Sequence, residues 1–296
     1  MIDYQALRQW EFPVIEHSYT VEDTMRYALA LGFGDDPVDA QQLPFVNDTV
    51  LGTPLAFPTM AVVLGFPGSW MQNPATGIDF QRIVHGEESL TLHAPLQAAG
   101  TVLARHRVTR IVDKGVGRGA LITYDKELTD KSTGRHLATV QHTTFARGDG
   151  GFSAHGGASD EPPALPPMIP RRKPDRIFEI TTLPVQALMY RLCADRNPLH
   201  SDPVVARAAG FERPILHGLC TYGIAARALL SVWCAGQPVC LRSISARFSA
   251  PVFPGETLQF ETYREDSSIM FRARIRNTER IVLDFGHAVV SDQAKA

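Results

Sequence analysis

The residues best suited to chemistry lie in segment 194–203, which reads ADRNPLHSDP. This segment places the carboxylate of Asp195 five positions before the imidazole of His200, in a polar stretch interrupted by proline. A carboxylate and an imidazole held close together can handle both protons of one water molecule. Farther along, His217 and Gly218 open a long apolar run, and a backbone N–H at a helix start can stabilise an oxyanion. These parts suit the addition of water to a double bond conjugated to a carbonyl, or its reversal.

The run that starts at Gly218 predicts a buried helix. Residues 218–234 are apolar nearly all round, with Arg227 as the main interruption and Gly236 just beyond. A helix of this kind belongs inside the curve of a sheet, and Arg227 argues against a membrane span. A further helix is expected over 22–31, with Thr20 as its N-cap.

The corresponding stretch of the first half, 58–70, cannot form an equally long helix. It is interrupted by Gly65, Pro67 and Gly68. Because proline and glycine both disfavour a helix interior, we expect only a short helix there. A shorter helix would leave empty space in the first half.

The chain reads as two weak repeats. The sequences HAPL at 93–96 and GTV at 100–102 resemble SAPV at 249–252 and GETL at 255–258. Each pair introduces segments in which apolar residues alternate with other residues, which is typical of strands with one buried face. The alternating residues Arg272, Arg274 and Arg276 are expected on an exposed strand face.

Segment 148–172 separates the repeats. It is rich in glycine, alanine, serine and proline, so it is expected to be a linker without regular structure. The predicted organisation is therefore an N-terminal repeat over 1–147, a linker over 148–172 and a C-terminal repeat over 173–296 that carries the catalytic motif.

Bulk properties exclude several classes of protein. The chain has 296 residues, 44% hydrophobic and 20% charged, and a net charge of −2, which gives no electrostatic case for nucleic acid as a partner. No run approaches the roughly 18 apolar residues of a membrane-spanning helix. The four cysteines form no CxxC pair, and the first ten residues lack the apolar core of a signal peptide. We therefore expect reduced thiols, a cytoplasmic location and no membrane association.

Several motifs occur in an order that resembles one family. They are DRNPLHSDP at 195–203, AGF at 209–211, PILHGLCT at 214–221, VHGE at 84–87, DKG at 113–115, GDGGF at 148–152 and ARF at 246–248. This order resembles the (R)-specific enoyl-CoA hydratases, also called hydratase 2 or MaoC-like dehydratases. The likeness covers nearly the whole chain. It is closest to the two-repeat form found as the hydratase domain of peroxisomal multifunctional enzyme type 2.

The resemblance implies both a fold and a reaction. The fold is an α+β double hot-dog, in which each repeat is a curved antiparallel sheet wrapped around a helix and the two sheets join edge to edge. The reaction is the reversible hydration of trans-2-enoyl-CoA to (3R)-3-hydroxyacyl-CoA in fatty-acid β-oxidation or related acyl-CoA metabolism. The interrupted first-half helix suggests room for medium-chain, long-chain or branched substrates, including a steroid side chain.

The resemblance also implies residue roles. Asp195 and His200 would hold the water and move its protons, in an order that the sequence leaves open. Gly218 would donate its N–H to the thioester oxygen, and His217 is expected to support the structure around the site. The first half carries no second pair with the Asp195–His200 spacing, so one active site per chain is implied.

Substrate contacts are implied for eight further residues: His85, Gly86, Lys114, Arg196, Asn197, Pro198, Leu199 and Phe248. Asn197 either orients the loop or contacts the ligand, and Pro198 restricts the backbone between the acid and the base. Lys114 is either a contact to a CoA phosphate or a solvated turn lysine. Phe248 packs either against CoA or in the core.

No cofactor or metal is expected, because coenzyme A is part of the substrate and no His, Cys or acidic cluster has metal-ligand spacing along the sequence. The expected partner is an acyl-CoA thioester, and we expect a homodimer. Two other functions stay open: a 3-hydroxyacyl carrier-protein dehydratase and a non-catalytic acyl-CoA-binding protein. The Asp195–His200 pair argues against the second.

Overall fold

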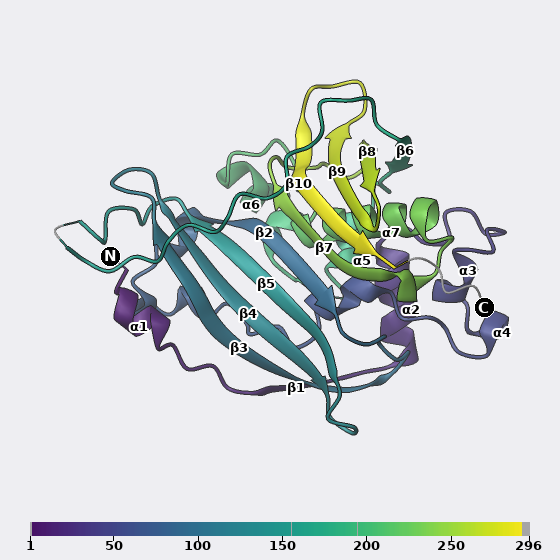
Figure 1. The fold of residues 1–296 in the computed structure, drawn as a ribbon, viewed down its shortest axis with the longest axis horizontal. Helices are drawn as coiled ribbons and strands as arrows, with labels where there is room; N and C mark the ends of the chain where they lie inside the picture. Colours follow the sequence, from purple (N-terminus) through teal and green to yellow (C-terminus); the bar gives the residue numbers. More distant parts are fainter. Residues whose placement is uncertain (1, 155, 194, 292–296) are drawn as a thin grey trace.

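A single ten-stranded antiparallel sheet runs through the molecule (Figure 1). The structure, a computed structural model, describes residues 2–154, 156–193 and 195–291. The strand order is β1-β3-β4-β5-β2-β7-β10-β9-β8-β6. The strands are β1 (Ile15–Tyr19), β2 (Ile83–Leu92), β3 (Gly100–Asp113), β4 (Ala120–Asp130), β5 (His136–Ala146), β6 (Arg176–Thr181), β7 (Leu241–Phe248), β8 (Thr257–Glu265), β9 (Ser268–Ile275) and β10 (Ile281–Val290).

The order of the strands repeats across the middle of the sheet. The first five strands follow the order β1-β3-β4-β5-β2, and the last five mirror it as β7-β10-β9-β8-β6. The two series meet where β2 pairs with β7, in a register that runs from Glu87↔Arg247 to Thr91↔Ser243. The expected double hot-dog, with two sheets joined edge to edge, is confirmed.

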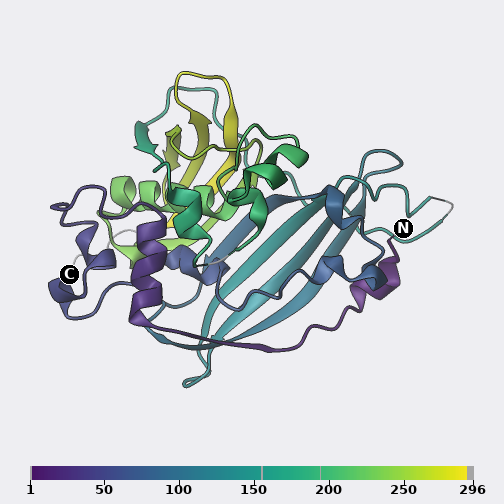
Figure 2. The same ribbon diagram turned by 180° about the vertical axis from the view of Figure 1, so that it is seen from behind.

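Helix α7 (Gly218–Trp233) fills the curve of the second half. Every residue from Cys220 to Leu230 is buried, which confirms the all-round apolar pattern. Helix α2 (Val21–Ala30) is capped by Thr20, whose hydroxyl accepts from the Asp23 N–H while the Asp23 carboxylate accepts from the Thr20 N–H. Seen from behind in Figure 2, these helices lie against one face of the sheet.

The helix of the first half is reduced to the short 3₁₀ helix η1 (Pro58–Val62), as predicted. Gly65, just after it, has a φ of +64°, a conformation that favours glycine. A Cβ at this position would stand 2.3 Å from the Cβ of Ala104 on β3. The chain therefore passes close against the sheet at Gly65, and the helix ends where α7 continues in the other half.

A buried lysine binds the carbonyls at the end of this short helix. The ammonium of Lys126, on β4, donates hydrogen bonds of 2.8–2.9 Å to the carbonyls of Ala61, Val62 and Leu64. Burial lowers the pKa of Lys126 to about 8. The carbonyls that a longer helix would have used internally are thus satisfied by a side chain.

The remaining helices are short. They are α1 (Tyr4–Arg8), α3 (Leu43–Val46), α4 (Asp48–Leu51), α5 (Gln186–Tyr190), α6 (Pro203–Ala208), and the 3₁₀ helices η2 (Trp70–Gln72), η3 (Pro74–Thr76), η4 (Phe80–Arg82), η5 (Pro198–His200) and η6 (Pro238–Cys240). In the described part of the chain, none is long and apolar enough to cross a membrane. Between β5 and β6 the described residues form turns and extended chain only.

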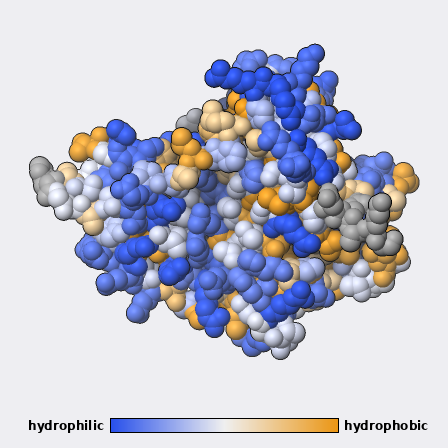
Figure 3. Space-filling view, in the orientation of Figure 1, coloured by the Kyte–Doolittle hydropathy of each residue, from blue (hydrophilic) through white to orange (hydrophobic). Residues whose placement is uncertain are grey.

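The outer face of the sheet is polar. In Figure 3 the surface over β3, β4 and β5 is mostly hydrophilic. At the other end of the sheet, Arg272 and Arg274 both pair with Glu261 at 2.7 Å. These arginines therefore stabilise the outer strand face by pairing with an acid of β8.

Candidate active site

The loop that carries Asp195 and His200 is shaped by its own side chains. The Asp195 carboxylate accepts from the N–H of Asn197 at 2.8 Å, and the Asn197 side-chain carbonyl accepts from the N–H of Leu199 at 3.0 Å. Pro198 then opens the 3₁₀ helix η5, which ends at His200. Asn197 thus orients the loop, and these local bonds set the separation between acid and imidazole.

The ring of His200 is buried, and one of its two nitrogens acts as a hydrogen-bond donor. Its Nδ1 donates to the carbonyl of Ile215 at 2.8 Å, so Nε2 carries the free lone pair. Burial lowers the pKa of His200 below its usual value of 6.5, an effect that the Ile215 carbonyl and the Asp195 charge partly oppose. A neutral imidazole with a free Nε2 can act as a proton acceptor at neutral pH.

His217 supports this arrangement. Its ring stacks on His200 with centroids 3.8 Å apart, and its Nε2 donates to the main-chain carbonyl of Asp195 at 2.9 Å. Burial and the neighbouring His200 lower the pKa of His217 to about 3, so this ring stays neutral. His217 therefore holds both the base and the backbone of the acid.

The acid and the base lie close enough for one water molecule to bridge them. A carboxylate oxygen of Asp195, a ring nitrogen of His200 and one of His217 all lie within 4.8 Å of one another. Asp195 is exposed, whereas both histidines are buried. A water between Asp195 and His200 could hydrogen-bond to both groups.

Gly218 is the first residue of α7, and its N–H has no acceptor within the helix. A Cβ on Gly218 would stand 3.2 Å from the ring of Phe248, so this ring lies directly against the helix start. The Phe248 ring also contacts His85, with ring centroids 4.4 Å apart. The structure thus brings Gly218, Phe248 and His85 together beside the Asp195–His200 pair.

Gly86 explains how His85 reaches this place. The pairing of β2 with β5 shifts register between His85 and Glu87, which marks a bulge at Gly86. A Cβ on Gly86 would stand 3.2 Å from the carbonyl of Thr143. Glu87 then pairs with Arg247 at 2.7 Å across the seam between the two halves, which links the VHGE and ARF motifs.

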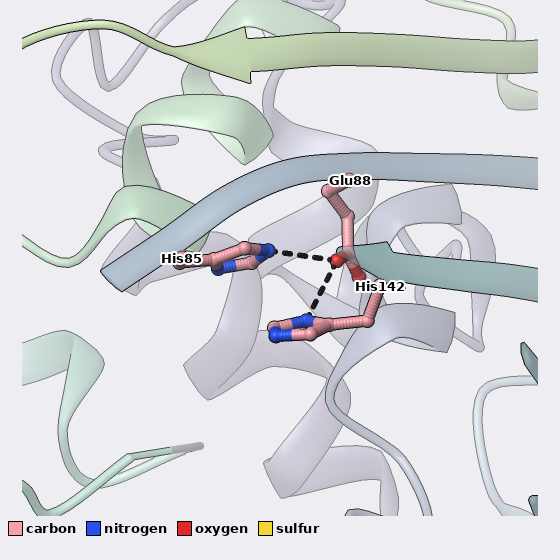
Figure 4. Close-up of side chains that lie close together, drawn as sticks. All are labelled: His85, Glu88 and His142. Atoms are coloured by element: carbon pink, nitrogen blue, oxygen red, sulfur yellow. Dashed lines mark hydrogen bonds and ion pairs between the residues drawn. The ribbon is translucent and has the colours of Figure 1, made fainter. Parts of the chain in front are cut away.

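The structure also reveals two polar residues that sequence reasoning missed. Glu88 is buried, and its Oε2 accepts hydrogen bonds of 3.0 Å from His85 Nε2 and from His142 Nδ1 (Figure 4). Burial by itself would raise the pKa of the Glu88 carboxyl, but the hydrogen bonds from His142 and His85 lower it to about 2. His142 lies on β5 directly opposite Glu88, so strand pairing was the only available signal.

Lys114, just after β3, packs against an aromatic ring. Its ammonium stands over the Phe145 ring, 4.8 Å from the centroid. Its neighbour Asp113 accepts from the N–H groups of Gly115, Gly151 and Ser153. The DKG and GDGGF motifs therefore hold each other in place. Arg196 is exposed on the loop.

A cavity of about 250 Å³ lies next to the short helix of the first half. Its walls come from β1, α2, the η1 region and the chain just before Asp195. They are formed by His17, Ser18, Tyr19, Asp23, Arg26, Tyr27, Met60, Val63, Leu64, Leu192 and Cys193. The interrupted helix is thus accompanied by open space, as expected.

Family models match both halves of the chain. Residues 17–148 match the MFE-2 hydratase 2 N-terminal domain, and residues 167–283 match the MaoC like domain. The enoyl-CoA hydratase ChsH3 of Mycobacterium tuberculosis is 38% identical over 269 residues, which cover 89% of this chain and 90% of that protein. The chain belongs to the MaoC-like hydratase 2 family.

Two further relatives agree with this placement. The 3-hydroxyacyl-thioester dehydratase Y of Mycobacterium tuberculosis is 40% identical, over 90% of this chain and 91% of its own length. The crystal structure of a MaoC-like dehydratase from Phytophthora capsici matches with a TM-score of 0.85 and 32% identity, over 99% of this chain and 100% of that one. The likeness therefore extends over the full double repeat.

Proposed function

We propose that this member of the hydratase 2 family catalyses the reversible hydration of trans-2-enoyl-CoA to (3R)-3-hydroxyacyl-CoA. The observation that carries the proposal is the Asp195–His200 pair beside the open N–H of Gly218. Members of the same family named as enoyl-CoA hydratases support it. The reaction needs a held water, a proton acceptor and a donor for the thioester oxygen, and this site offers one candidate for each.

His200 is the proton-moving group in this proposal. Because Nδ1 donates to Ile215, only Nε2 can take a proton from the water as its oxygen attacks C3. The imidazolium that forms can return the same proton to C2 from the same side, so the atoms of water are added without any other donor. Asp195 accepts the second O–H of the water and orients it, and the same groups run the reverse elimination.

Gly218 binds the thioester oxygen as negative charge develops on it. The N–H at the start of α7 points along the positive end of a 16-residue helix. One such donor contributes about 3–4 kcal/mol to a transition state of this kind. Phe248 and His85 line the approach to this position, and Pro198 and Leu199 shape the loop that ends at His200.

The acyl tail is proposed to enter the first half, where the cavity beside η1 offers room for medium-chain, long-chain or branched groups. The reaction is proposed to need no metal or cofactor, because His200 has a free Nε2 to receive the proton of water. We further propose a cytoplasmic homodimer. Cys193, Cys220 and Cys240 are free thiols, which fits a reducing compartment.

The carrier of the acyl group is a second question, because one relative is named a 3-hydroxyacyl-thioester dehydratase. That activity is the same step in reverse. Measuring the reaction with matched acyl groups on CoA and on a carrier protein decides between the two carriers.

The test of the proposal is a substrate panel. Loss of the conjugated double bond is followed with crotonyl-CoA and trans-2-decenoyl-CoA, and the products are separated by chiral chromatography. The (3R) product is expected from both substrates. An (S) product or thioester hydrolysis would refute the proposed reaction, and turnover of crotonyl-CoA alone would refute only the role of the cavity.

A further inference from the structure

The first half holds a cluster of titratable side chains that moves no proton in the proposed hydration, although one of its members, His85, also lies against Phe248. His85, Glu88 and His142 offer two ring nitrogens and one carboxylate oxygen, all within 4.8 Å of one another. We propose that these three residues form a binding site for a divalent metal ion of the zinc class. Two imidazoles and one carboxylate are a donor set that zinc uses in proteins.

The fold aims these side chains at one point. On a regular strand, His85 and Glu88 would point to opposite faces, because they are three positions apart. The bulge at Gly86 adds one residue and turns both to the same face. His142 pairs directly opposite Glu88 on the neighbouring strand, so all three meet above the β2–β5 pair (Figure 4).

The distances suit a shared ion. His85 Nε2 and His142 Nδ1 each lie 3.0 Å from Glu88 Oε2. Two ligands bound to one zinc at about 2.1 Å in a tetrahedral arrangement are roughly 3.4 Å apart. Small side-chain rotations would therefore let one metal ion take the place of the two hydrogen bonds that now join the rings to the Glu88 oxygen.

The burial of the carboxylate also favours a cation. The side chain of Glu88 is 2% exposed, and within the described residues its ion-pair partners are only the two imidazoles. The buried ammonium of Lys126 donates instead to three backbone carbonyls. A divalent ion held by the three side chains would pair directly with the buried carboxylate.

The site is open on one side, and its two imidazole ligands are only partly held in place. The His85 and His142 side chains are 22% and 21% exposed, which leaves a path for the ion and a position for water as a fourth ligand. Among the described residues, the other nitrogen of each ring makes no hydrogen bond, whereas tight zinc sites usually hold that nitrogen. We therefore expect zinc to bind about 10–100-fold more weakly here than at a site whose ligands are held in that way.

A second triad, Asp195, His200 and His217, is the internal competitor. Its carboxylate accepts from the Asn197 N–H rather than from either ring. In contrast, the rings of His85 and His142 already converge on the Glu88 oxygen. The cluster around Glu88 is therefore the more nearly assembled site.

The experiment is a zinc titration of the purified full-length chain after treatment with a chelator and desalting. A colorimetric chelator competes for the zinc, and Co²⁺ serves as a spectroscopic probe of coordination. The wild type is expected to bind one zinc, to show a visible Co²⁺ band and to melt at a higher temperature with zinc. Glu88→Gln and His142→Gln are each expected to weaken binding at least about tenfold.

His93→Gln is the matched control. His93 stacks on His136 with centroids 4.1 Å apart and bonds to the Thr139 hydroxyl, without an acid between the rings. This variant is expected to bind zinc as the wild type does. The proposal is overturned if the wild type binds no zinc at about 100 µM, if Glu88→Gln binds normally, or if only His200→Ala abolishes binding. A wild type that binds no zinc overturns the proposal whether or not the variants fold, and His142→Gln locates the site if Glu88→Gln does not fold.

Discussion

Two stacked imidazoles lie at the proposed active site, and replacing each in turn by phenylalanine should show which one moves the proton. Phenylalanine keeps a ring in the stack between His200 and His217. His200→Phe removes the free Nε2, whereas His217→Phe removes only a donor to the Asp195 carbonyl. The two variants thus separate proton transfer from positioning.

The expected losses differ in size. Removing a general base costs about 10²–10⁴ in rate, so His200→Phe should lower kcat/KM at least about a hundredfold. The hydrogen bond that His217 donates contributes about 1 kcal/mol, which corresponds to roughly fivefold. His217→Phe also removes a buried Nδ1 without a partner among the described residues, so stability should not fall.

The assay is the hydration of crotonyl-CoA measured across pH, with circular dichroism as the check on folding. His200 must be neutral to accept a proton, so activity should fall as the pH drops through the pKa of His200, which burial places below 6.5. This acidic limb should persist in His217→Phe, because the pKa of His217 is about 3. Equal losses in both variants, or disappearance of the limb in His217→Phe, would contradict this division of roles.

Four other outcomes are expected. Hydration should survive dialysis against a chelator, even if the His85–Glu88–His142 site is emptied, and activity restored only by added metal would contradict this. Residues 172–296 expressed alone should be insoluble or inactive, because strand β7 would expose the edge that β2 covers; a soluble, fully active fragment would refute the shared site. Lys126→Met should lower the free energy of unfolding by about 2–4 kcal/mol in urea titrations, because three buried carbonyls lose their donor, and an unchanged midpoint would count against it. Burial lowers the pKa of His106 from 6.5 to about 4 in the folded protein. Between these two values a proton binds the unfolded chain more readily than the folded one, so stability declines as the pH falls. His106→Phe should therefore stabilise the protein more at pH 5 than at pH 7, as thermal melts can show.

The sequence by itself determined the local parts of the proposed site. The loop from Asp195 to His200 is shaped by bonds between residues two positions apart, so the motif carries its own geometry. The buried helix that starts at Gly218 and the break near Gly65 follow from composition over a single segment. The repeat of strand order also has a sequence trace, because equivalent turns follow β2 and β7.

Sequence motifs did not reveal which residues act at the site and which hold the fold. Asp113 and the glycine-rich segment after β5 are tied to each other by hydrogen bonds, and Lys114 stands over Phe145. The pairing of Glu87 with Arg247 closes the seam between the halves. These partners are far apart in the chain, so spacing alone could not separate the two roles.

Tertiary structure alone decided what surrounds the proposed active site. His142 meets Glu88 only because β5 pairs with β2, and His85 joins them only because the strand bulges at Gly86. The stacking of His217 on His200 and the three carbonyls held by Lys126 likewise depend on packing between distant segments. The physical reason is that a bulge or a one-residue change of register reverses which face a side chain occupies, and the strand pairing that fixes the register is non-local.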